Sequence, residues 1–228
     1  MPGGGPKYEA YEHNALDPEP MLLDGRKERI DLVLAQRTRT LTVVLDRLED
    51  NFNMGAVVRT CEGMGLQELH VIRNAEVPFR PNPKVTQGCE KWMDLHLHRD
   101  FGSCREHLRG RGYALWASAL HPEAKSVSEM RFDSRIALVF GNERFGVSPE
   151  VLEGCDGLFW IPMRGFTRSL NVSAAVSAAL TRAVSWREEH LGSSGDLSAE
   201  EASVLRERFR RLSVKQRHRI YRPGQGRP

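Results

Sequence analysis

The strongest constraint on the fold is a regular alternation of two kinds of segment between residues 41 and 183. Short runs rich in β-branched and aromatic residues predict strands at 41–48, 68–72, 93–98, 113–120, 135–141 and 157–163. Between them, helices are expected at 55–65, 104–112 and 148–155, and a longer helix follows at 172–190. Such alternation is typical of βαβ units, which build a mostly parallel sheet covered by helices. The sequence therefore predicts an α/β fold for its central part.

The segments outside this core differ from it in composition. Residues 1–24 are rich in Gly, Pro and acids and lack the basic start and apolar stretch of a signal peptide, so a flexible leader is expected. A short helix is expected within 25–40, the α/β domain at 41–191, and a basic helical extension at 196–228. Ser198, with Glu201 three residues later, has the pattern of a capping box that would start the last helix.

Composition narrows the class of protein. A chain of 228 residues with 40% hydrophobic and 28% charged residues suits one globular domain with extensions. No apolar run approaches the length of a membrane span, so no membrane contact is expected. The four cysteines have neither the close spacing of zinc sites nor the density of a disulfide scaffold, which indicates reduced thiols and a cytoplasmic protein.

Two other groups of side chains have structural interpretations. His96 and His98 alternate with acidic residues along one expected strand, but a metal site there would need more ligands than the sequence shows. We therefore expect a solvated strand face and no metal. Trp92, Trp116 and Trp160 are expected in the core rather than as platforms on which bases stack.

Basic residues are unevenly distributed, although the formal net charge is only +3. The candidate RNA-binding residues of the C-terminal segment are Arg206, Arg208, Arg210, Arg211, Lys215 and Arg217. A smaller basic cluster occurs at 26–39. Such clusters can neutralise phosphates and give affinity that does not depend on base sequence. By charge alone, a solvated helix face or a disordered tail explains the pattern better.

Three segments could carry chemistry, and the first is 49–65, where an expected strand gives way to a helix. Ligands of open α/β sheets bind at this edge. Asn51 or Asn53 could cap the helix, and Gly55 would leave its first turn accessible to a phosphate. Arg59 would project about one turn further along the helix. By spacing alone, the better interpretation is that Asn53 only caps the helix and Arg59 is only a surface residue.

The second segment, 138–150, leaves a buried strand at Gly141 and continues through Asn142, Glu143 and Arg144 in a turn. Because glycine has no Cβ, the backbone here could approach an adenosine closely. A turn whose charges face water explains the same residues equally well.

The third segment, 161–180, passes through a loop to a long helix rich in Ala, Ser and Val. Ser169 or Asn171 would cap that helix. Its small residues allow another backbone to pack closely, which suits a buried helix or a subunit interface.

In this order and position, the three segments resemble the three motifs of the SPOUT-class RNA methyltransferases, specifically the TrmH family of tRNA guanosine ribose 2'-O-methyltransferases. The resemblance extends over roughly residues 26–217 and includes the segment QGCEKWMDLHLH. It implies a trefoil-knotted sheet that binds S-adenosylmethionine in the knot. It also implies a homodimer whose active sites lie at the subunit interface.

The resemblance also assigns roles to residues, position by position in the motifs. The catalytic residues would be Asn53, Arg59, Glu143, Ser169 and Asn171. The cofactor pocket would be lined by Ser118, Gly141, Asn142, Ile161, Met163, Ser169 and Leu170. The flanking helices look like those of enzymes that methylate guanosine 18 in the D-loop, so tRNA is the expected substrate.

The mechanism leaves one question open. The family's proposed general base is Arg59, yet a free guanidinium is a permanent cation. Arg59 could instead hold a phosphate and polarise the 2'-hydroxyl, while Ser169, Asn171 or a water accepts the proton.

Two rival functions also remain. The same reaction on rRNA or on another tRNA ribose is the first. A non-catalytic RNA-binding SPOUT module is the second, and the intact Gly141, Ile161, Ser169 and Asn171 argue against it.

Overall fold

The computed structural model describes residues 22–142 and 144–220, with side chains as far as Val214. Most of the predicted leader, the predicted catalytic Glu143 and the side chains of Lys215 and Arg217 lie outside the described residues.

Seven strands form one sheet in the order β3-β2-β1-β6-β4-β7-β5, and every neighbouring pair runs parallel. The strands are β1 (Leu41–Asp46), β2 (Glu68–Ile72), β3 (Asp94–His98), β4 (Ala114–Ser118), β5 (Lys125–Ser126), β6 (Ile136–Phe140) and β7 (Gly157–Trp160). All six predicted strands are present, and the α/β fold is confirmed. The trefoil knot stays a prediction.

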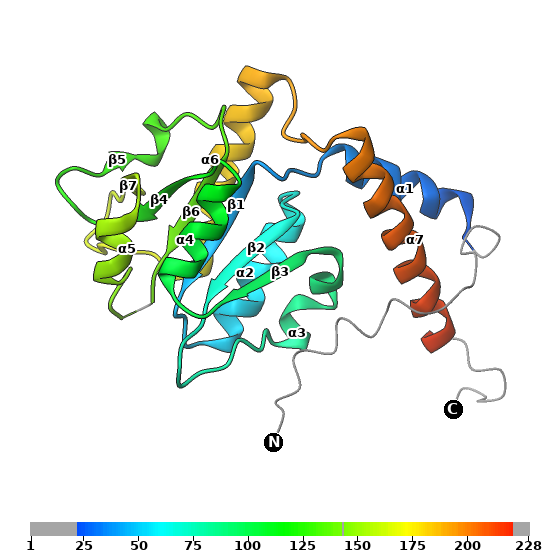
Figure 1. Ribbon diagram of the computed structural model, residues 1–228, viewed down its shortest axis with the longest axis horizontal. Coiled ribbons are helices and arrows are strands. Elements are labelled where there is room, and N and C mark those ends of the chain that lie inside the picture. The colour runs from blue at the N-terminus through cyan, green and yellow to red at the C-terminus, as the bar shows by residue number, and fades with distance from the viewer. Residues whose placement is uncertain (1–21, 143, 221–228) are drawn as a thin grey trace.

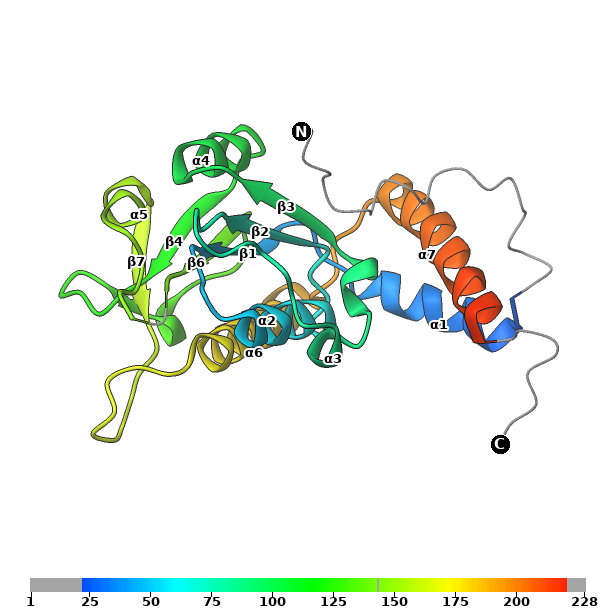
Figure 2. The ribbon, with the colours of Figure 1, turned by 90° about the horizontal axis from the view of Figure 1, so that it is seen from below.

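Helices cover both faces of the sheet, as Figures 1 and 2 show. The helices α2 (Asn51–Gly63), α3 (Pro83–Thr86) and α6 (Val172–Leu191) lie on one face, and α4 (Phe101–Gly110) and α5 (Pro149–Gly154) lie on the other. Two 3-10 helices, η3 (Cys89–Trp92) and η4 (Val127–Glu129), complete the domain. Within the part of the chain that the structure describes, no helix has the length and apolar character needed to cross a membrane.

The two cores follow from the alternation of side chains along each strand. In β1, Val43 and Leu45 pack toward α2 and α6, whereas Val44 packs toward α4 and α5. The central strands β1 and β6 are buried along their whole length, because a parallel sheet covered on both faces leaves neither side of such a strand in water. This is why β6 is a continuous apolar run and why β1 is mostly apolar.

The small residues of α6 allow it to pack closely beside α2. Val176, Ala179 and Ala183 are fully buried in the core beneath it. The hydroxyl of Thr60 on α2 lies 3.3 Å from that of Ser177 on α6. One side of α6 is therefore buried in the domain, and its role in a subunit interface stays a prediction.

Two further helices, α1 (Asp24–Ala35) and α7 (Ala199–Ile220), lie side by side at one end of the sheet (Figure 1). Ile30 and Leu34 of α1 pack with Leu205 and Phe209 of α7 in a small separate core. The predicted capping box is confirmed at the start of α7. The Ser198 N–H donates to the Glu201 carboxylate at 2.8 Å, and the Glu201 N–H donates to the Ser198 hydroxyl at 3.1 Å.

A buried arginine ties these helices to the domain. Arg187, near the end of α6, is only 4% exposed. Its guanidinium donates to the Phe132 carbonyl oxygen at 3.0 Å, to the Thr38 hydroxyl at 2.8 Å and to the Asp196 carboxylate at 3.1 Å. Thr38 follows α1 and Asp196 precedes α7, so this one side chain fixes where both flanking helices join the sheet.

Candidate cofactor pocket and active site

A cavity of about 450 Å³ lies at the carboxyl ends of β4, β6 and β7. Its volume is in the range of small-molecule sites, and its position is the edge at which open α/β sheets bind ligands. The cavity is lined by all seven residues predicted for the cofactor pocket: Ser118, Gly141, Asn142, Ile161, Met163, Ser169 and Leu170. Three segments distant in the sequence thus meet at one hollow.

The turn after β6 shows why Gly141 is a glycine. A Cβ on Gly141 would lie 2.0 Å from the Gly146 carbonyl carbon and 2.1 Å from the Val147 nitrogen. The Gly146 N–H donates to the Asn142 carbonyl oxygen at 2.8 Å, which folds the turn back on itself. The missing Cβ therefore gives space to the turn's own backbone, whereas from the sequence we expected an approaching adenosine to use that space.

The side chain of Asn142 holds this turn to the neighbouring strand. Its amide group donates to the Arg47 carbonyl oxygen at 3.2 Å, and its oxygen accepts from the Arg144 N–H at 2.8 Å. The pocket wall is consequently fixed by hydrogen bonds within the protein itself.

The loop between β7 and α6 provides another wall of the cavity and is mostly exposed. Ser169 and Leu170 line the cavity from this loop, and Phe166 is fully exposed. Asn171 caps α6, since its side-chain oxygen accepts from the Ser173 N–H at 2.9 Å. Of the two predicted N-caps of α6, Asn171 is confirmed, and Ser169 does not cap the helix.

Asn171 also reaches the first motif. Its side-chain N–H donates to the side-chain oxygen of Asn53 at 3.0 Å. Asn53 lies in the first turn of α2, which begins with Asp50 as its N-cap. The Asp50 carboxylate accepts from the Phe52 N–H at 2.7 Å, so the prediction that Asn51 or Asn53 caps this helix is wrong.

The expected access for a phosphate at Gly55 is also wrong. Gly55 is buried, and a Cβ there would lie 3.1 Å from the Val85 Cβ and 3.2 Å from the Asn82 nitrogen. The Asn82 N–H donates to the Asn51 carbonyl oxygen at 3.3 Å. The segment that carries α3 therefore covers the first turn of α2, and Gly55 serves this packing.

Arg59 lies on the exposed side of α2. Its guanidinium donates to the Val85 carbonyl oxygen at 3.2 Å, which tethers it to the end of α3 and leaves its other N–H groups available. The predicted catalytic residues thus divide into the Asn53–Asn171 pair, Ser169 on the cavity wall, and Arg59 on α2.

Several cavity residues were not predicted from the sequence. They are Phe140, Ala119, Leu120, Arg144, Phe145, Gly146, Val147, Leu152, Trp160, Arg168, Val172 and Ala175. Trp160 was expected in the core, yet it is only half-buried and contributes to the pocket. The signal that could have found them was position, because Leu120 and Trp160 stand at the ends of strands that flank the site.

The cysteines take no part in this chemistry. All four thiols are free, as expected. Burial raises the pKa of Cys104 and of Cys155 to about 12, and that of Cys89 to about 11. Because only a thiolate is an effective nucleophile, these groups are unreactive at neutral pH.

The residues around the cavity fit S-adenosylmethionine. Ile161, Met163 and Leu170 offer an apolar surface for an adenine ring, and Ser118, Asn142 and Ser169 offer polar groups for a ribose and an amino acid. Backbone at the strand ends is exposed to the same hollow. A parallel sheet with this pocket at the carboxyl ends of β4, β6 and β7 defines the chain as an α/β protein with a ligand site at the edge of its sheet.

Comparison with models of protein families shows which family the chain belongs to. The model of the SpoU rRNA Methylase family matches residues 40–181, which contain all three motifs. The chain belongs to this family. The resemblance stated from the sequence is confirmed.

Individual relatives agree. A protein named tRNA (guanosine(18)-2'-O)-methyltransferase from Aquifex aeolicus is 33% identical over 207 residues, covering 86% of this chain and 98% of the relative. One of the same name from Thermus thermophilus is 35% identical over 160 residues, covering 70% of this chain and 82% of the relative. The likeness to the Aquifex protein thus extends beyond the family domain.

Solved structures give the same result. The A. aeolicus TrmH/SpoU tRNA modifying enzyme superposes with a TM-score of 0.76 at 32% identity, over 84% of this chain and 98% of that one. The SpoU methyltransferase AviRb from Streptomyces viridochromogenes, solved with the cofactor AdoMet, has a TM-score of 0.60 at 25% identity, over 68% of this chain and 64% of that one. AviRb, a protein of this fold, therefore binds S-adenosylmethionine, which is the cofactor expected for this chain.

Proposed function

We propose that this protein transfers a methyl group from S-adenosylmethionine to the ribose 2'-hydroxyl of a guanosine in tRNA, and that this guanosine is position 18 of the D-loop. The observation that carries the proposal is one cavity lined by the second and third motifs, with the third motif hydrogen-bonded to the first through the Asn53–Asn171 pair. The tRNA assignment is supported by the likeness to the Aquifex protein, which includes the flanking helices.

S-adenosylmethionine, when bound, supplies a methyl group on a sulfonium, which is a good electrophile. The chain would hold it through Ser118, Gly141, Asn142, Ile161, Met163, Ser169 and Leu170. Their contribution is to bind and orient the donor, because holding two reactants in line supplies much of the acceleration in a transfer of this kind.

Arg59, Asn53, Ser169 and Asn171 would act on the RNA side. Arg59 would hold a phosphate of the substrate and polarise its 2'-hydroxyl, since a guanidinium is a poor proton acceptor. Asn171 would orient Asn53 through the hydrogen bond between them. The hydroxyl proton would pass to Ser169 or to a water molecule, and Glu143 is assigned to this set by its motif alone.

We also infer that the active protein is a cytoplasmic homodimer. Phe145 and Phe166 are exposed aromatic residues on the two loops that surround the cavity. Large apolar side chains gathered beside a site are typical of a surface that another subunit covers. A second copy placed there would shield the reaction from water, and sedimentation of the purified protein would show the dimer.

The flanking helices are proposed as extensions that bind RNA. On this division, residues 25–40 and 196–228 lie outside a catalytic domain at 41–191, and a leader occupies 1–24. Arg206, Arg208, Arg210, Arg211, Lys215 and Arg217 are the proposed contacts to phosphates.

One alternative has support of its own. A protein named 23S rRNA (guanosine-2'-O-)-methyltransferase RlmB from Acinetobacter baylyi is 28% identical over 171 residues. The same reaction on rRNA would use the same pocket and would differ only in the surface that receives RNA.

Methyl transfer to unmodified RNA tests the proposal. Purified protein is incubated with labelled S-adenosylmethionine and either a tRNA transcript or an rRNA fragment, and the modified ribose is mapped by primer extension at low nucleotide concentration. We expect label in tRNA at guanosine 18. Label in rRNA alone would favour the alternative, and folded protein that binds S-adenosylmethionine but methylates neither RNA would contradict both.

A further inference from the structure

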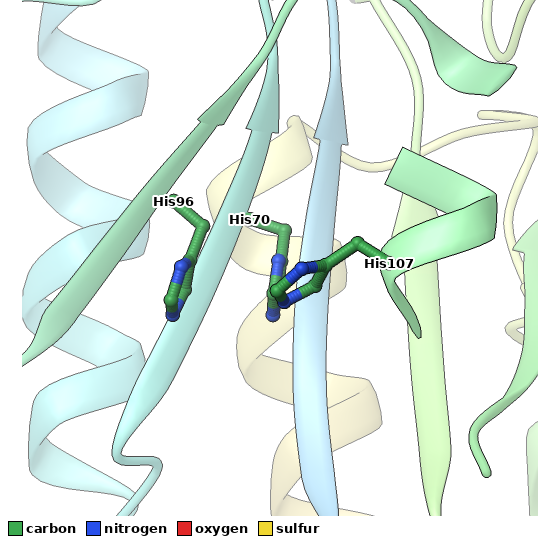
Figure 3. A group of neighbouring side chains, drawn as sticks. All are labelled: His70, His96 and His107. Atoms are coloured by element: carbon green, nitrogen blue, oxygen red, sulfur yellow. The ribbon is translucent and has the colours of Figure 1, made fainter. Parts of the chain in front are cut away.

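Four histidines gather between the sheet and α4, at the end of the sheet opposite the part that holds the cofactor cavity. His70 comes from β2, His96 and His98 from β3, and His107 from α4. Figure 3 shows the rings of His70, His96 and His107 turned toward one another. The ring centroids of His70 and His96 are 4.6 Å apart, and those of His96 and His107 are 5.4 Å apart.

This arrangement overturns the expected solvated strand face. Apart from Ile72, the β2 and β3 residues that face α4 are polar, whereas Leu69 and Leu95 on the opposite side pack into the main core. The helix α4 covers the polar side, so His96 and His98 are only partly exposed. The sequence showed too few metal ligands at His96 because the others come from β2 and α4.

Two imidazole nitrogens in the cluster lack hydrogen-bond partners. His70 is fully buried, and its Nδ1 shares a hydrogen bond of 3.0 Å with the Nε2 of His98. Its Nε2 is buried without a hydrogen bond, and the nearest carboxylate oxygen, from Glu68, is 3.6 Å away. The Nε2 of His96 is also buried and unpartnered. Buried polar atoms are almost always paired, so these two point to a missing ligand.

Charges near the cluster are largely compensated within the protein. Arg111 donates to both oxygens of Glu68 at 2.6 and 2.8 Å, and its Nη1 lies 3.4 Å from the Nε2 of His107. Arg39 bridges Glu68 and Asp94.

We propose that His70, His96 and His107 bind one transition-metal ion of the zinc type, with a fourth position open to water. One nitrogen from each lies within 4.8 Å of the others. Tetrahedral zinc with three imidazoles places these nitrogens roughly 3.4 Å apart, which modest side-chain rotation achieves. Imidazole ligands select zinc, cobalt, nickel or copper over magnesium and calcium.

A second set, His70, His98 and Cys104, has equally close ligand atoms but is less suited to a metal. In that set, the Nδ1 of His70 and the Nε2 of His98 are already hydrogen-bonded to each other at 3.0 Å, and a metal would have to break this bond.

A metal at this position would be structural. It would join β2, β3 and α4, and none of its ligands lines the cofactor cavity. The ion would act through the stability of one edge of the sheet and not by contact with the bound cofactor.

The test uses the full chain, stripped of metal with a chelator and then titrated with zinc against a chromophoric competitor. We expect one zinc ion per chain and a higher Tm with zinc than without it, because a ligand bound only by the folded state stabilises that state. Cobalt in place of zinc should give the visible absorption of a tetrahedral site. His96→Asn and, separately, His107→Asn should each lower zinc affinity by roughly tenfold or more.

The matched control is His121→Asn, because His121 is exposed and lies in the segment after β4, outside the cluster. It should bind zinc as the unchanged protein does. Circular dichroism and S-adenosylmethionine binding show whether each variant is folded. The proposal is overturned if the folded, metal-free protein binds no zinc at micromolar concentration, or if both cluster variants bind it as tightly as His121→Asn.

Discussion

The side-chain N–H of Asn171 donates to the side-chain oxygen of Asn53 across 3.0 Å, although the two residues are 118 positions apart in the sequence. Asn171 is the N-cap of α6, and Asn53 lies in the first turn of α2, the helix that carries Arg59. The loop that lines the cofactor cavity is therefore coupled to the helix that would meet the RNA.

Two substitutions separate the capping role of Asn171 from its contact with Asn53. Asn171→Ala removes both and should lower the free energy of unfolding by about 1 kcal/mol. Asn171→Ser keeps a capping oxygen but is too short to reach Asn53, so stability should be nearly unchanged. Methyl transfer should fall in both variants, on the order of 100-fold, if the pair positions the substrate side. Urea unfolding and initial rates measure the two effects, and an unchanged rate for Asn171→Ser would make the pair purely structural.

A pair of glycine substitutions tests the turn after β6. Gly141→Ala forces a Cβ into the backbone of Gly146 and Val147, and overpacking of this kind costs about 1–3 kcal/mol. Because the displaced turn is a wall of the cavity, affinity for S-adenosylmethionine should fall by roughly tenfold or more. Gly110→Ala, at the end of α4, has open space around it and should leave both quantities within about 1 kcal/mol. Calorimetry showing equal cofactor affinity in the two variants would contradict the role of the turn.

Much of the sheet and the pocket is predictable from the sequence. Strands such as 136–140 are continuous apolar runs, and a parallel sheet then places their carboxyl ends at one edge. The pocket residues Ser118, Gly141 and Ile161 lie at or just after those ends, although it was the family resemblance that assigned them to the cofactor. The strand β5 was missed because two residues carry no periodicity.

The predictions that failed concern residues whose contacts come from distant parts of the chain. Asp50 caps the N-terminus of α2, and the segment that carries α3 covers its first turn. Gly55 is therefore a packing residue rather than part of a phosphate site. His96 seemed isolated because His70 and His107 lie on other elements. Nothing local to Gly55 or His96 records these contacts, whereas the register of the sheet and the position of α4 determine them.

Arg59 offers a test of the RNA side of the reaction. Its hydrogen bond is to the Val85 carbonyl oxygen on the surface, so Arg59→Ala should change the free energy of unfolding by no more than about 0.5 kcal/mol. Cofactor affinity should persist while methyl transfer is lost. Arg59→Lys keeps the charge without the planar fork and should retain only part of the rate. Equal loss of cofactor binding and of transfer in the alanine variant would instead place Arg59 in the pocket.

The buried Arg187 should be among the most sensitive positions for stability. Arg187→Met removes the cation that pairs with the Asp196 carboxylate and the donor to the Phe132 carbonyl oxygen, and breaking a buried ion pair costs about 3–5 kcal/mol. The control is Arg182→Met on the same helix, where one hydrogen bond to the Ser128 carbonyl oxygen at 3.2 Å is lost at the surface. That change should cost about 1 kcal/mol or less. Thermal unfolding of the two variants should therefore differ clearly, and similar Tm values would show that the Arg187 network contributes little.

The basic helix α7 is the surface on which charge predicts an RNA contact, and the structure divides its arginines into two groups. Arg208 donates to Asp94 and, at 2.9 Å, to the Met93 carbonyl oxygen, which anchors α7 to the start of β3. Arg206 pairs with Asp31 at 2.6 Å, and Arg211 pairs with Glu207 on the helix itself. These last two pairs are partly exposed and are worth little in water, so a phosphate can replace the carboxylates.

Replacing Arg206, Arg210 and Arg211 with Gln should therefore weaken tRNA binding while S-adenosylmethionine affinity persists. Each phosphate contact that is lost removes about 0.9 from the slope of log K against log salt, so the salt dependence should flatten as affinity falls. Arg208→Gln should act differently: it should lower the free energy of unfolding, because it leaves Asp94 with one arginine fewer. Filter binding across a salt titration, with urea unfolding of both variants, measures these effects. If the triple variant kept the affinity and slope of the unchanged protein, α7 would be a packing element, and tRNA would have to bind on the basic residues of α1 or on the core.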